Sequence, residues 1–248
     1  MWTGLEIDQA LNCKVGALKD NTFNGISINS KKISKGDLFI PIKGARFDGH
    51  NFVVEALKNG AYASLAEKPY SKKLEKVKKK VIFVDDTYKS LIKLAIFSRK
   101  RAKNSVIISI TGSSGKTTLK EWLKEVLSTY YNTYANLGNL NNQIGVPLTL
   151  ANIPCNSDVS IIEVGMNQPG EIEALTKIIK PNIAIITNIG SAHIGNFKTK
   201  KDIASEKSQI FKFLTKNDTA IIPKDDEYFK ILKKQASKKS GNIFSFGK

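Results

Sequence analysis

Residues 109–119 read SITGSSGKTTL, a glycine- and serine-rich turn between the apolar segment 105–110 and an amphipathic segment. The strict phosphate-binding pattern G-x-x-x-x-G-K-[ST] needs a glycine at position 110, where this chain has Ile110. A strand, a Gly-Lys-Thr-Thr turn and a helix in this order are nevertheless the setting in which backbone N–H groups and a helix N-terminus face an anion. The stretch therefore predicts a nucleotide loop of variant design. A glycine turn that only caps a helix is the alternative.

Within this loop Lys116 has the length to reach the β- and γ-phosphates of a nucleotide, and the Thr117 hydroxyl is suited to hold Mg²⁺. The predicted nucleotide-binding residues are Gly112, Ser113, Ser114, Gly115, Lys116, Thr117 and Thr118.

From residue 86 the chain alternates between helical and strand patterns. The periodicity predicts helices at 87–101, 117–131, 170–179 and 200–214, and strands at 105–110, 157–166, 181–190, 219–223 and 242–246. In the helix 117–131 the residues Leu119, Trp122, Leu123, Val126, Leu127 and Tyr130 are expected to form one buried stripe. Alternation of this kind predicts a mostly parallel sheet with helices on both faces, a domain of the P-loop ATPase type.

Residues 1–85 have a different pattern of short strands and turns. A strand is expected in 36–44, a helix in 51–61 that stops at Gly60, and a second strand in 81–86. The fold class is therefore α/β, with a small mixed domain at 1–85 and a nucleotide-binding domain at 86–248.

Composition limits the kinds of partner that this chain is expected to bind. The net charge of +17 comes from 36 lysines and only three arginines, with a dense run at 72–80. Nucleic-acid readers favour the planar fork of arginine, so a solvated lysine-rich surface is expected rather than nucleic-acid binding. There is no apolar run long enough to span a membrane, no secretory signal pattern, and only Cys13 and Cys155 as thiols. A cytoplasmic location is expected.

Further polar residues follow the strands of the second domain. Glu163 comes late in a buried strand, and His193 follows the next strand after a Gly-Ser turn. Both positions lie where the carboxyl ends of parallel strands place a ligand site. Four asparagines, Asn136, Asn139, Asn141 and Asn142, crowd a loop at and just before the stretch 138–150. Their clustering indicates either a rigid turn or amide recognition of a polar substrate. Lys207 lies on the helix after His193, and composition alone does not distinguish it.

Four segments in this order, TGSSGKTT, NLNNQIGVPLTL, EVGMNQPGEI and NIGSAHIGNF, resemble the Mur ligase superfamily, and NSKKISKGDLFIPIKGARFDGHNFVVEALKNGA is similar to its UDP-substrate domain. The likeness covers nearly all of the chain. Within the superfamily it is greatest to the member that joins D-alanyl-D-alanine to UDP-N-acetylmuramoyl-tripeptide in peptidoglycan precursor synthesis. The ligase of the preceding step and a non-catalytic nucleotide-binding module remain as alternatives, and folylpolyglutamate-type ligases are more distant.

The resemblance implies ATP-dependent amide formation through an acyl phosphate, in a monomer. It implies that Lys116 holds the phosphates, that Thr117 and Glu163 hold one Mg²⁺, and that His193 binds a second. Lys207 matches a lysine that the superfamily carbamylates, which would turn its ammonium into an anionic metal-binding oxygen donor. The resemblance implies catalytic roles for Lys116, His193 and Lys207. Asn139, Asn141 and Asn142 would face the muramoyl peptide, and Ser30, Arg46 and Phe47 the uridine end.

Two departures from the family pattern stand out. Asn29-Ser30-Lys31 replaces the usual Asp-Ser-Arg, which removes an arginine fork from the uridine side. The chain also reaches Lys248 soon after a predicted strand, without the C-terminal ligase domain that the resemblance implies. We therefore expect a truncated chain that does not ligate by itself.

Overall fold

The computed structural model describes residues 1–44, 47–192 and 194–248 and divides into two compact units. The first comprises residues 1–101 with 150–152, and the second comprises 102–149 with 153–248. The predicted domain boundary lies after residue 85, whereas the unit boundary lies after Arg101, because helix α3 (Thr87–Arg101) packs on elements of the first unit, α1 and β5.

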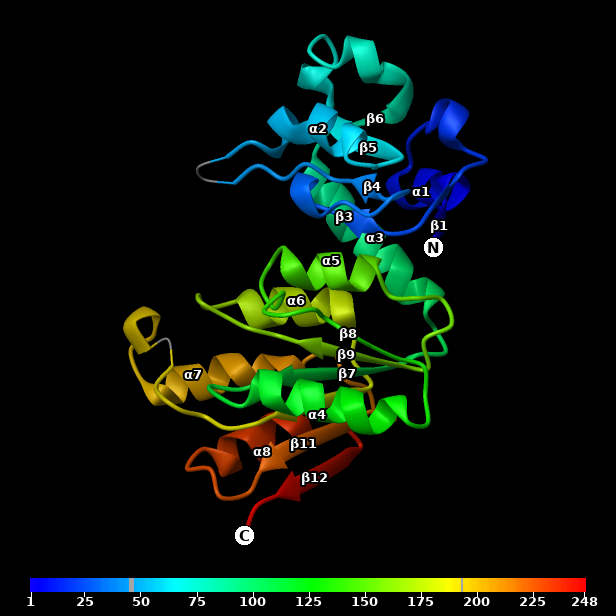
Figure 1. The fold of residues 1–248 in the computed structure, drawn as a ribbon. Coiled ribbons are helices and arrows are strands. Elements are labelled where there is room, and N and C mark those ends of the chain that lie inside the picture. The colour runs from blue at the N-terminus through cyan, green and yellow to red at the C-terminus, as the bar shows by residue number, and fades with distance from the viewer. Residues whose placement is uncertain (45–46, 193) are drawn as a thin grey trace. The chain divides into compact units, whose positions relative to one another are not determined.

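The first unit is built from very short elements (Figure 1). Its α-helices and strands are β1 (Trp2–Thr3), α1 (Gly4–Leu11), β2 (Thr22–Phe23), β3 (Ile26–Ser27), β4 (Leu38–Phe39), α2 (Val53–Lys58), β5 (Ala63–Glu67), β6 (Val81–Val84) and α3. Short 3₁₀ helices cover Gly16–Leu18, Ser30–Lys32, Gly49–Phe52, Lys68–Tyr70 and Glu75–Lys80. Strands β3, β4, β5 and β6 form a parallel sheet in that order, and β1 pairs antiparallel with β2.

Local sequence accounts for several of these limits. The expected strand in 36–44 pairs regularly only at Leu38–Phe39, and Pro41 just beyond it has no N–H for a ladder. Helix α2 ends at Lys58, two residues before Gly60, whose φ is +116°. Phe39, Val53, Ala56, Ala66 and Leu74 are buried together in a core of this unit.

The second unit is a six-stranded parallel sheet flanked by helices, as expected. Its elements are β7 (Val106–Thr111), α4 (Lys116–Ser128), β8 (Thr133–Ala135), α5 (Gly145–Ala151), β9 (Val159–Glu163), α6 (Glu171–Ile179), β10 (Ile183–Ile186), α7 (Lys200–Lys207), β11 (Thr219–Pro223), α8 (Phe229–Ser237) and β12 (Asn242–Phe246), with 3₁₀ turns at Ile194–Asn196 and Ser208–Phe211. The strand order is β12-β11-β10-β7-β9-β8. Strand β8 and helix α5 were not predicted, and α5 lies within the stretch read as a loop.

The strand order defines where a ligand site belongs. Strand β7 pairs with β9 on one side and β10 on the other, and the chain leaves β7 first toward β8 and β9 before it crosses to β10. At such a switch point the connections diverge and open a crevice at the carboxyl ends of the strands. The SITGSSGKTTL loop begins at this end of β7.

Helix α4 is rotated relative to the expected stripe. Leu119, Leu123 and Leu127 pack on a sheet core that includes Ile108, Ile110 and Ile161. Trp122, Val126 and Tyr130 are instead 65%, 61% and 81% exposed, so the prediction of their burial was wrong. With about 3.6 residues per turn, the buried face is shifted toward Lys120, whose side chain is completely buried. Apolar periodicity could not locate this face because a lysine occupies it.

Among residues 1–44, 47–192 and 194–248, no helix is both long and apolar enough to cross a lipid bilayer.

Candidate nucleotide site

The loop between β7 and α4 depends on two glycines. Gly112 has φ +155°, and a Cβ placed on it would overlap the Thr187 hydroxyl at the end of β10. Gly115 has φ +76° and precedes the first residue of α4. Glycine is the residue that adopts such backbone angles without steric cost. The close approach at Gly112 brings the loop against the neighbouring strand end.

Residues 187–190 hold the loop from that side. The Ser113 and Ser114 N–H groups donate to the backbone and side-chain oxygens of Asn188, both at 3.0 Å. The Asn188 amide donates back to the Ser114 hydroxyl at 2.8 Å, and the Gly190 N–H donates to the Ser113 hydroxyl at 2.7 Å. Two amides expected to face an anion are thus bonded to this segment, which fixes the shape of the loop.

The anion-facing groups are then those of the first turn of α4. The Leu119 N–H bonds back to the Gly115 oxygen at 3.0 Å, and the N–H groups before it in the first helical turn have no partners within the helix. The Lys116 ammonium donates to the Gly112 oxygen at 2.9 Å. Burial lowers the pKa of Lys116, and the Glu163 carboxylate opposes the shift. The lysine and the helix terminus together suit a phosphate group.

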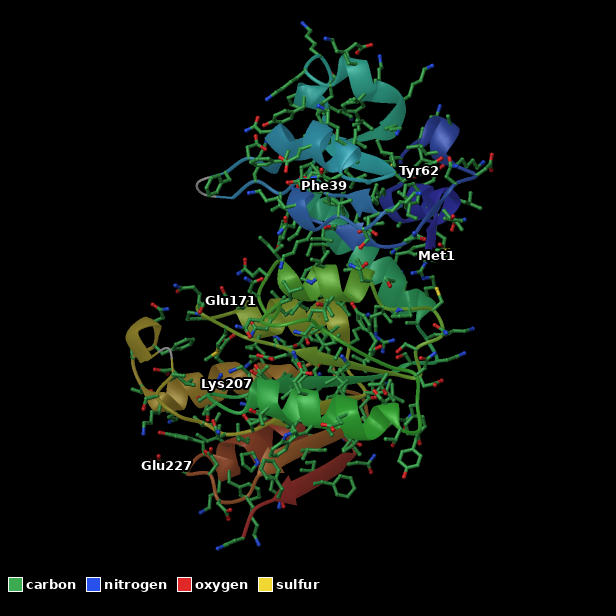
Figure 2. All side chains as sticks on the ribbon, viewed as in Figure 1. Met1, Phe39, Tyr62, Glu171, Lys207 and Glu227 are labelled. Carbon is green, nitrogen blue, oxygen red and sulfur yellow. The ribbon has the colours of Figure 1, made fainter. Side chains whose placement is uncertain are left out.

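Lys207 reaches the same point from α7. Its ammonium donates to the Gly112 oxygen at 2.9 Å, and the side chain is 1% exposed (labelled in Figure 2). Burial and the nearby Lys116 ammonium lower the pKa of Lys207 to about 7, while Glu206 acts in the opposite direction. The structure therefore brings together two of the predicted catalytic residues, Lys116 and Lys207. The neutral form of Lys207 is accessible near pH 7.

Glu163, at the end of β9, is buried beside the loop. The Thr117 hydroxyl donates to its Oε2 at 2.8 Å and the Asn141 amide to its Oε1 at 2.8 Å. The Thr117 hydroxyl and the Glu163 carboxylate are hard oxygen donors of the kind Mg²⁺ prefers. Within the described ranges there is no group of three or more His, Cys, Asp or Glu side chains arranged for a metal. The pair fits a magnesium ion that also binds nucleotide phosphates, rather than one held by protein alone.

The asparagine stretch has separate local roles. The Asn142 side chain accepts from the Ile144 and Gly145 N–H groups at 3.1 and 2.8 Å and so caps α5. Asn141 holds Glu163, whereas Asn139 has an exposed side chain. Two of the three predicted substrate residues thus have their side chains engaged in structural bonds.

The remaining predicted residues lie elsewhere. Thr118 is exposed in the first turn of α4. In the first unit, Ser30 is buried with its hydroxyl 3.4 Å from Glu55, and Phe47 is 71% exposed. Arg46 and His193 lie outside the described residues.

Sequence reasoning missed three residues that shape this region, Lys120, Asn188 and Glu206, and it noted Asn136 only as a member of the asparagine cluster. The Asn136 carboxamide accepts the Glu163 N–H at 3.0 Å, and the Glu206 carboxylate accepts the Gly170 and Ile172 N–H groups, both at 3.0 Å. Asn188 follows β10 directly, so the strand-end rule that selected His193 could also have selected it. Nothing in the local sequence marks Lys120 or Glu206.

The parallel sheet has a Gly-Lys-Thr turn at its switch point, two lysines bonded to that turn, and a Thr–Glu pair of oxygen donors beside it. These are the features of an α/β domain that binds nucleotide phosphates. Comparison with known proteins makes the family specific. Residues 110–248 match the model of the Mur ligase middle domain, and residues 22–99 match the model described as the Mur ligase family catalytic domain. The chain belongs to the Mur ligase family.

Individual relatives agree with this. The UDP-N-acetylmuramoyl-tripeptide--D-alanyl-D-alanine ligase of Rickettsia prowazekii is 40% identical over 246 residues, which are 98% of this chain and 51% of that protein. The enzyme of the same name from Treponema pallidum is 43% identical over 83% of this chain and 46% of its own length. The chain spans about half the length of these curated relatives.

Solved structures show the same likeness. A crystal structure of MurF from Acinetobacter baumannii matches with a TM-score of 0.86 and 34% identity, over 99% of this chain and 53% of that one. MurF from Thermotoga maritima, solved in complex with ADP, matches with a TM-score of 0.73 and 33% identity, over 89% of this chain and 50% of that one.

Proposed function

We propose that this chain carries the nucleotide-binding and UDP-substrate-binding parts of an ATP-dependent ligase that joins D-alanyl-D-alanine to UDP-N-acetylmuramoyl-tripeptide. The observation that carries the proposal is the convergence of Lys116 and Lys207 on the Gly112 oxygen, next to the Thr117–Glu163 pair. The names of the relatives supply the substrates. Both ATP and a nucleotide-linked precursor belong to the cytoplasm, which is the location that goes with this proposal.

In the proposed reaction the terminal carboxylate of the tripeptide attacks the γ-phosphorus of ATP, and ADP leaves. The amine of D-alanyl-D-alanine then attacks the acyl phosphate, and the tetrahedral adduct collapses with loss of phosphate. Such steps depend mainly on positioning and on neutralising charge. Lys116 and the N-terminus of α4 neutralise the phosphates, while Thr117 and Glu163 would hold the Mg²⁺ that accompanies ATP. His193 is proposed, by resemblance alone, to hold a second ion.

Lys207 is proposed to react with CO₂ to give a carbamate, which replaces a buried cation by an anionic oxygen donor. Only the neutral amine attacks CO₂, and the lowered pKa makes that form accessible near neutrality.

The lowered pKa of Lys207 also makes the stability of the fold depend on pH. An unfolded lysine binds its proton up to about pH 10.4, so between about pH 7 and that value the unfolded state binds more protons. Stability against unfolding therefore rises with pH across this window.

The pH dependence of the carbamate can be measured directly. At fixed CO₂ pressure, ¹³C-carbamate on Lys207 should increase at least about tenfold between pH 6 and pH 8, because the neutral fraction increases by that factor around a pKa near 7. The ¹³C NMR signal should be absent in Lys207→Gln. A signal that does not change with pH, or that persists in the variant, contradicts the assignment.

The first unit is proposed to bind the uridine end of the substrate, with Ser30, Arg46 and Phe47 as candidate contacts. Asn139, Asn141 and Asn142 stay candidate contacts for the muramoyl peptide. Asn139 and Asn142 are both exposed, but the Asn142 side-chain oxygen is bonded to the Ile144 and Gly145 N–H groups, so Asn139 is the one most available to a ligand.

Calorimetric titration tests the substrate class. UDP-N-acetylmuramoyl-tripeptide should bind the chain one to one, and more tightly than the UDP-muramoyl-dipeptide on which the preceding ligase acts. Equal or reversed preference would favour that preceding ligase. If ATP binds but no UDP-muramoyl peptide does, the chain is a nucleotide-binding module and the ligase proposal is wrong. Phosphate release with all three substrates would exclude a purely non-catalytic module.

A further inference from the structure

Lys120 lies on α4, one turn after Lys116, and is completely buried. Its ammonium donates to the backbone oxygens of Asn136 at 2.9 Å and Gly138 at 3.1 Å. It also forms an ion pair with Glu121 at 3.0 Å. Two hydrogen bonds and an ion pair compensate the buried ammonium, as a buried cation requires.

These bonds hold the backbone at residues 136 and 138. The segment Asn136–Asn141 in turn holds Glu163. The Asn136 side chain accepts the Glu163 N–H at 3.0 Å and donates to the Leu140 oxygen at 3.1 Å. Asn141 donates to Glu163 Oε1 at 2.8 Å and accepts the Gly165 N–H at 2.8 Å through its backbone oxygen. The segment tied down by Lys120 therefore contacts Glu163 at both its backbone and its carboxylate.

Lys120 also acts on Glu163 through charge. Its ammonium is 4.0 Å from Oε2, the oxygen that accepts the Thr117 hydroxyl, and both side chains are buried. The Lys120 side chain therefore lies directly behind the carboxylate oxygen that faces the loop. No other lysine side chain in the described ranges is as buried as Lys120, and apart from Lys207 none is nearly so.

We propose that Lys120 is a positioning residue that presents the Glu163 carboxylate to the magnesium ion of Mg-ATP, acting through the segment Asn136–Asn141. It does not contact the nucleotide in this role. The inference rests on the proposed nucleotide function, but the contacts by which Lys120 holds the segment Asn136–Asn141 against Glu163 can be tested without any ligand.

The ligand-free test is amide hydrogen exchange in Lys120→Met, which keeps the length of the side chain and removes the charge and the donors. The Glu163 and Gly165 N–H groups, bonded to Asn136 and Asn141, should exchange about tenfold faster or more, since the Asn136 and Gly138 carbonyls lose their donor. The Val164 N–H, bonded to Ile110 in the adjacent strand, is the internal control and should change little. Equal exchange of all three in variant and wild type overturns the proposal.

The ligand test is the affinity for ATP with and without Mg²⁺. Groups that orient a metal ligand change metal affinity roughly 10- to 100-fold when removed, so Lys120→Met should weaken Mg-ATP binding by that factor. ATP binding in EDTA should change less than about twofold, whereas a general loss of structure would weaken both equally. In the Glu163→Gln background, Lys120→Met should weaken Mg-ATP binding by less than a further factor of about two, because the effects of coupled residues are not additive. Additive losses, or equal losses with and without Mg²⁺, contradict the positioning role.

Two further comparisons complete the design. Lys124→Met, one turn further along α4, is the matched control and should behave as wild type. If Lys120→Met does not fold, Lys120→Gln, which retains one amide donor, should show smaller changes of the same kind, and no change in it contradicts the proposal. If the wild type shows no Mg²⁺-dependent ATP binding, the proposed function fails, and the exchange experiment still decides whether Lys120 holds the segment.

Discussion

Replacing Lys116 by alanine is expected to weaken ATP binding by at least about 30-fold. Removing one member of a close charge pair with a phosphate costs about 2–5 kcal/mol, and each 1.4 kcal/mol corresponds to a factor of ten in affinity. The fold should be retained, because Lys116 is only half-buried and its one bond in the free loop is to the Gly112 oxygen. Titration calorimetry with Mg-ATP measures the effect. In a chain able to turn over, acyl-phosphate formation should disappear with it.

Two controls make this result specific to the loop. Lys124→Ala, on the same helix, should leave ATP affinity within about twofold of the wild type, in the range of ordinary surface changes. Binding of UDP-N-acetylmuramoyl-tripeptide to Lys116→Ala should persist, because its candidate uridine contacts belong to the first unit. ATP affinity that stays within threefold in Lys116→Ala would remove the assignment of this loop.

Replacing Gly112 by alanine is expected to destabilise the second unit by about 3 kcal/mol, which for a unit of this size lowers its melting temperature by roughly 10 °C. The new Cβ would overlap the Thr187 hydroxyl, which donates to the Ser114 oxygen at 2.6 Å. Either the loop or the end of β10 must move, so ATP affinity should fall as well. Scanning calorimetry and ATP titration measure the two effects.

Gly115→Ala is the matched comparison within the same loop. A Cβ on Gly115 meets no atom within 4 Å, so only the positive φ opposes the substitution, at about 1–2 kcal/mol. Gly112→Ala should therefore be clearly the less stable of the two. If both variants melt at the same temperature, the close approach of Gly112 to Thr187 does not determine the loop.

The strand–loop–helix context could be predicted from the sequence because it depends on local patterns. Alternating apolar segments identified the parallel sheet, and the Gly-Lys-Thr-Thr turn identified the end of β7 as a nucleotide site. Helix α3 was predicted with the limits that the structure shows, Thr87–Arg101. The loop was expected to face an anion along its whole backbone. Its Ser113 and Ser114 N–H groups instead donate to Asn188, 74 residues beyond Ser114, and no local pattern records that pairing.

Long-range contacts explain what could not be predicted. Hydropathy places a lysine such as Lys120 at the surface, and its burial depends on carbonyl oxygens delivered by residues 136–138. Lys120 lies on the buried face of α4 beside Leu119 and Leu123, whereas Trp122 and Val126 are exposed. Lys207 was indistinguishable among the lysines until a family resemblance selected it, and its contact with Gly112 O joins residues far apart in sequence. Helix α5 was hidden by the asparagines and by Pro147, which is tolerated in the first turn of a helix.

The measurement that tests the central claim most directly is titration of the wild-type chain and Glu163→Gln with ATP, each in excess Mg²⁺ and in EDTA. If the loop, Lys116 and the Thr117–Glu163 pair form an Mg-ATP site, the wild type binds one ATP per chain, Mg²⁺ strengthens that binding, and Glu163→Gln removes most of the Mg²⁺ effect. Absence of ATP binding, or an affinity that depends on neither Mg²⁺ nor Glu163, contradicts the account.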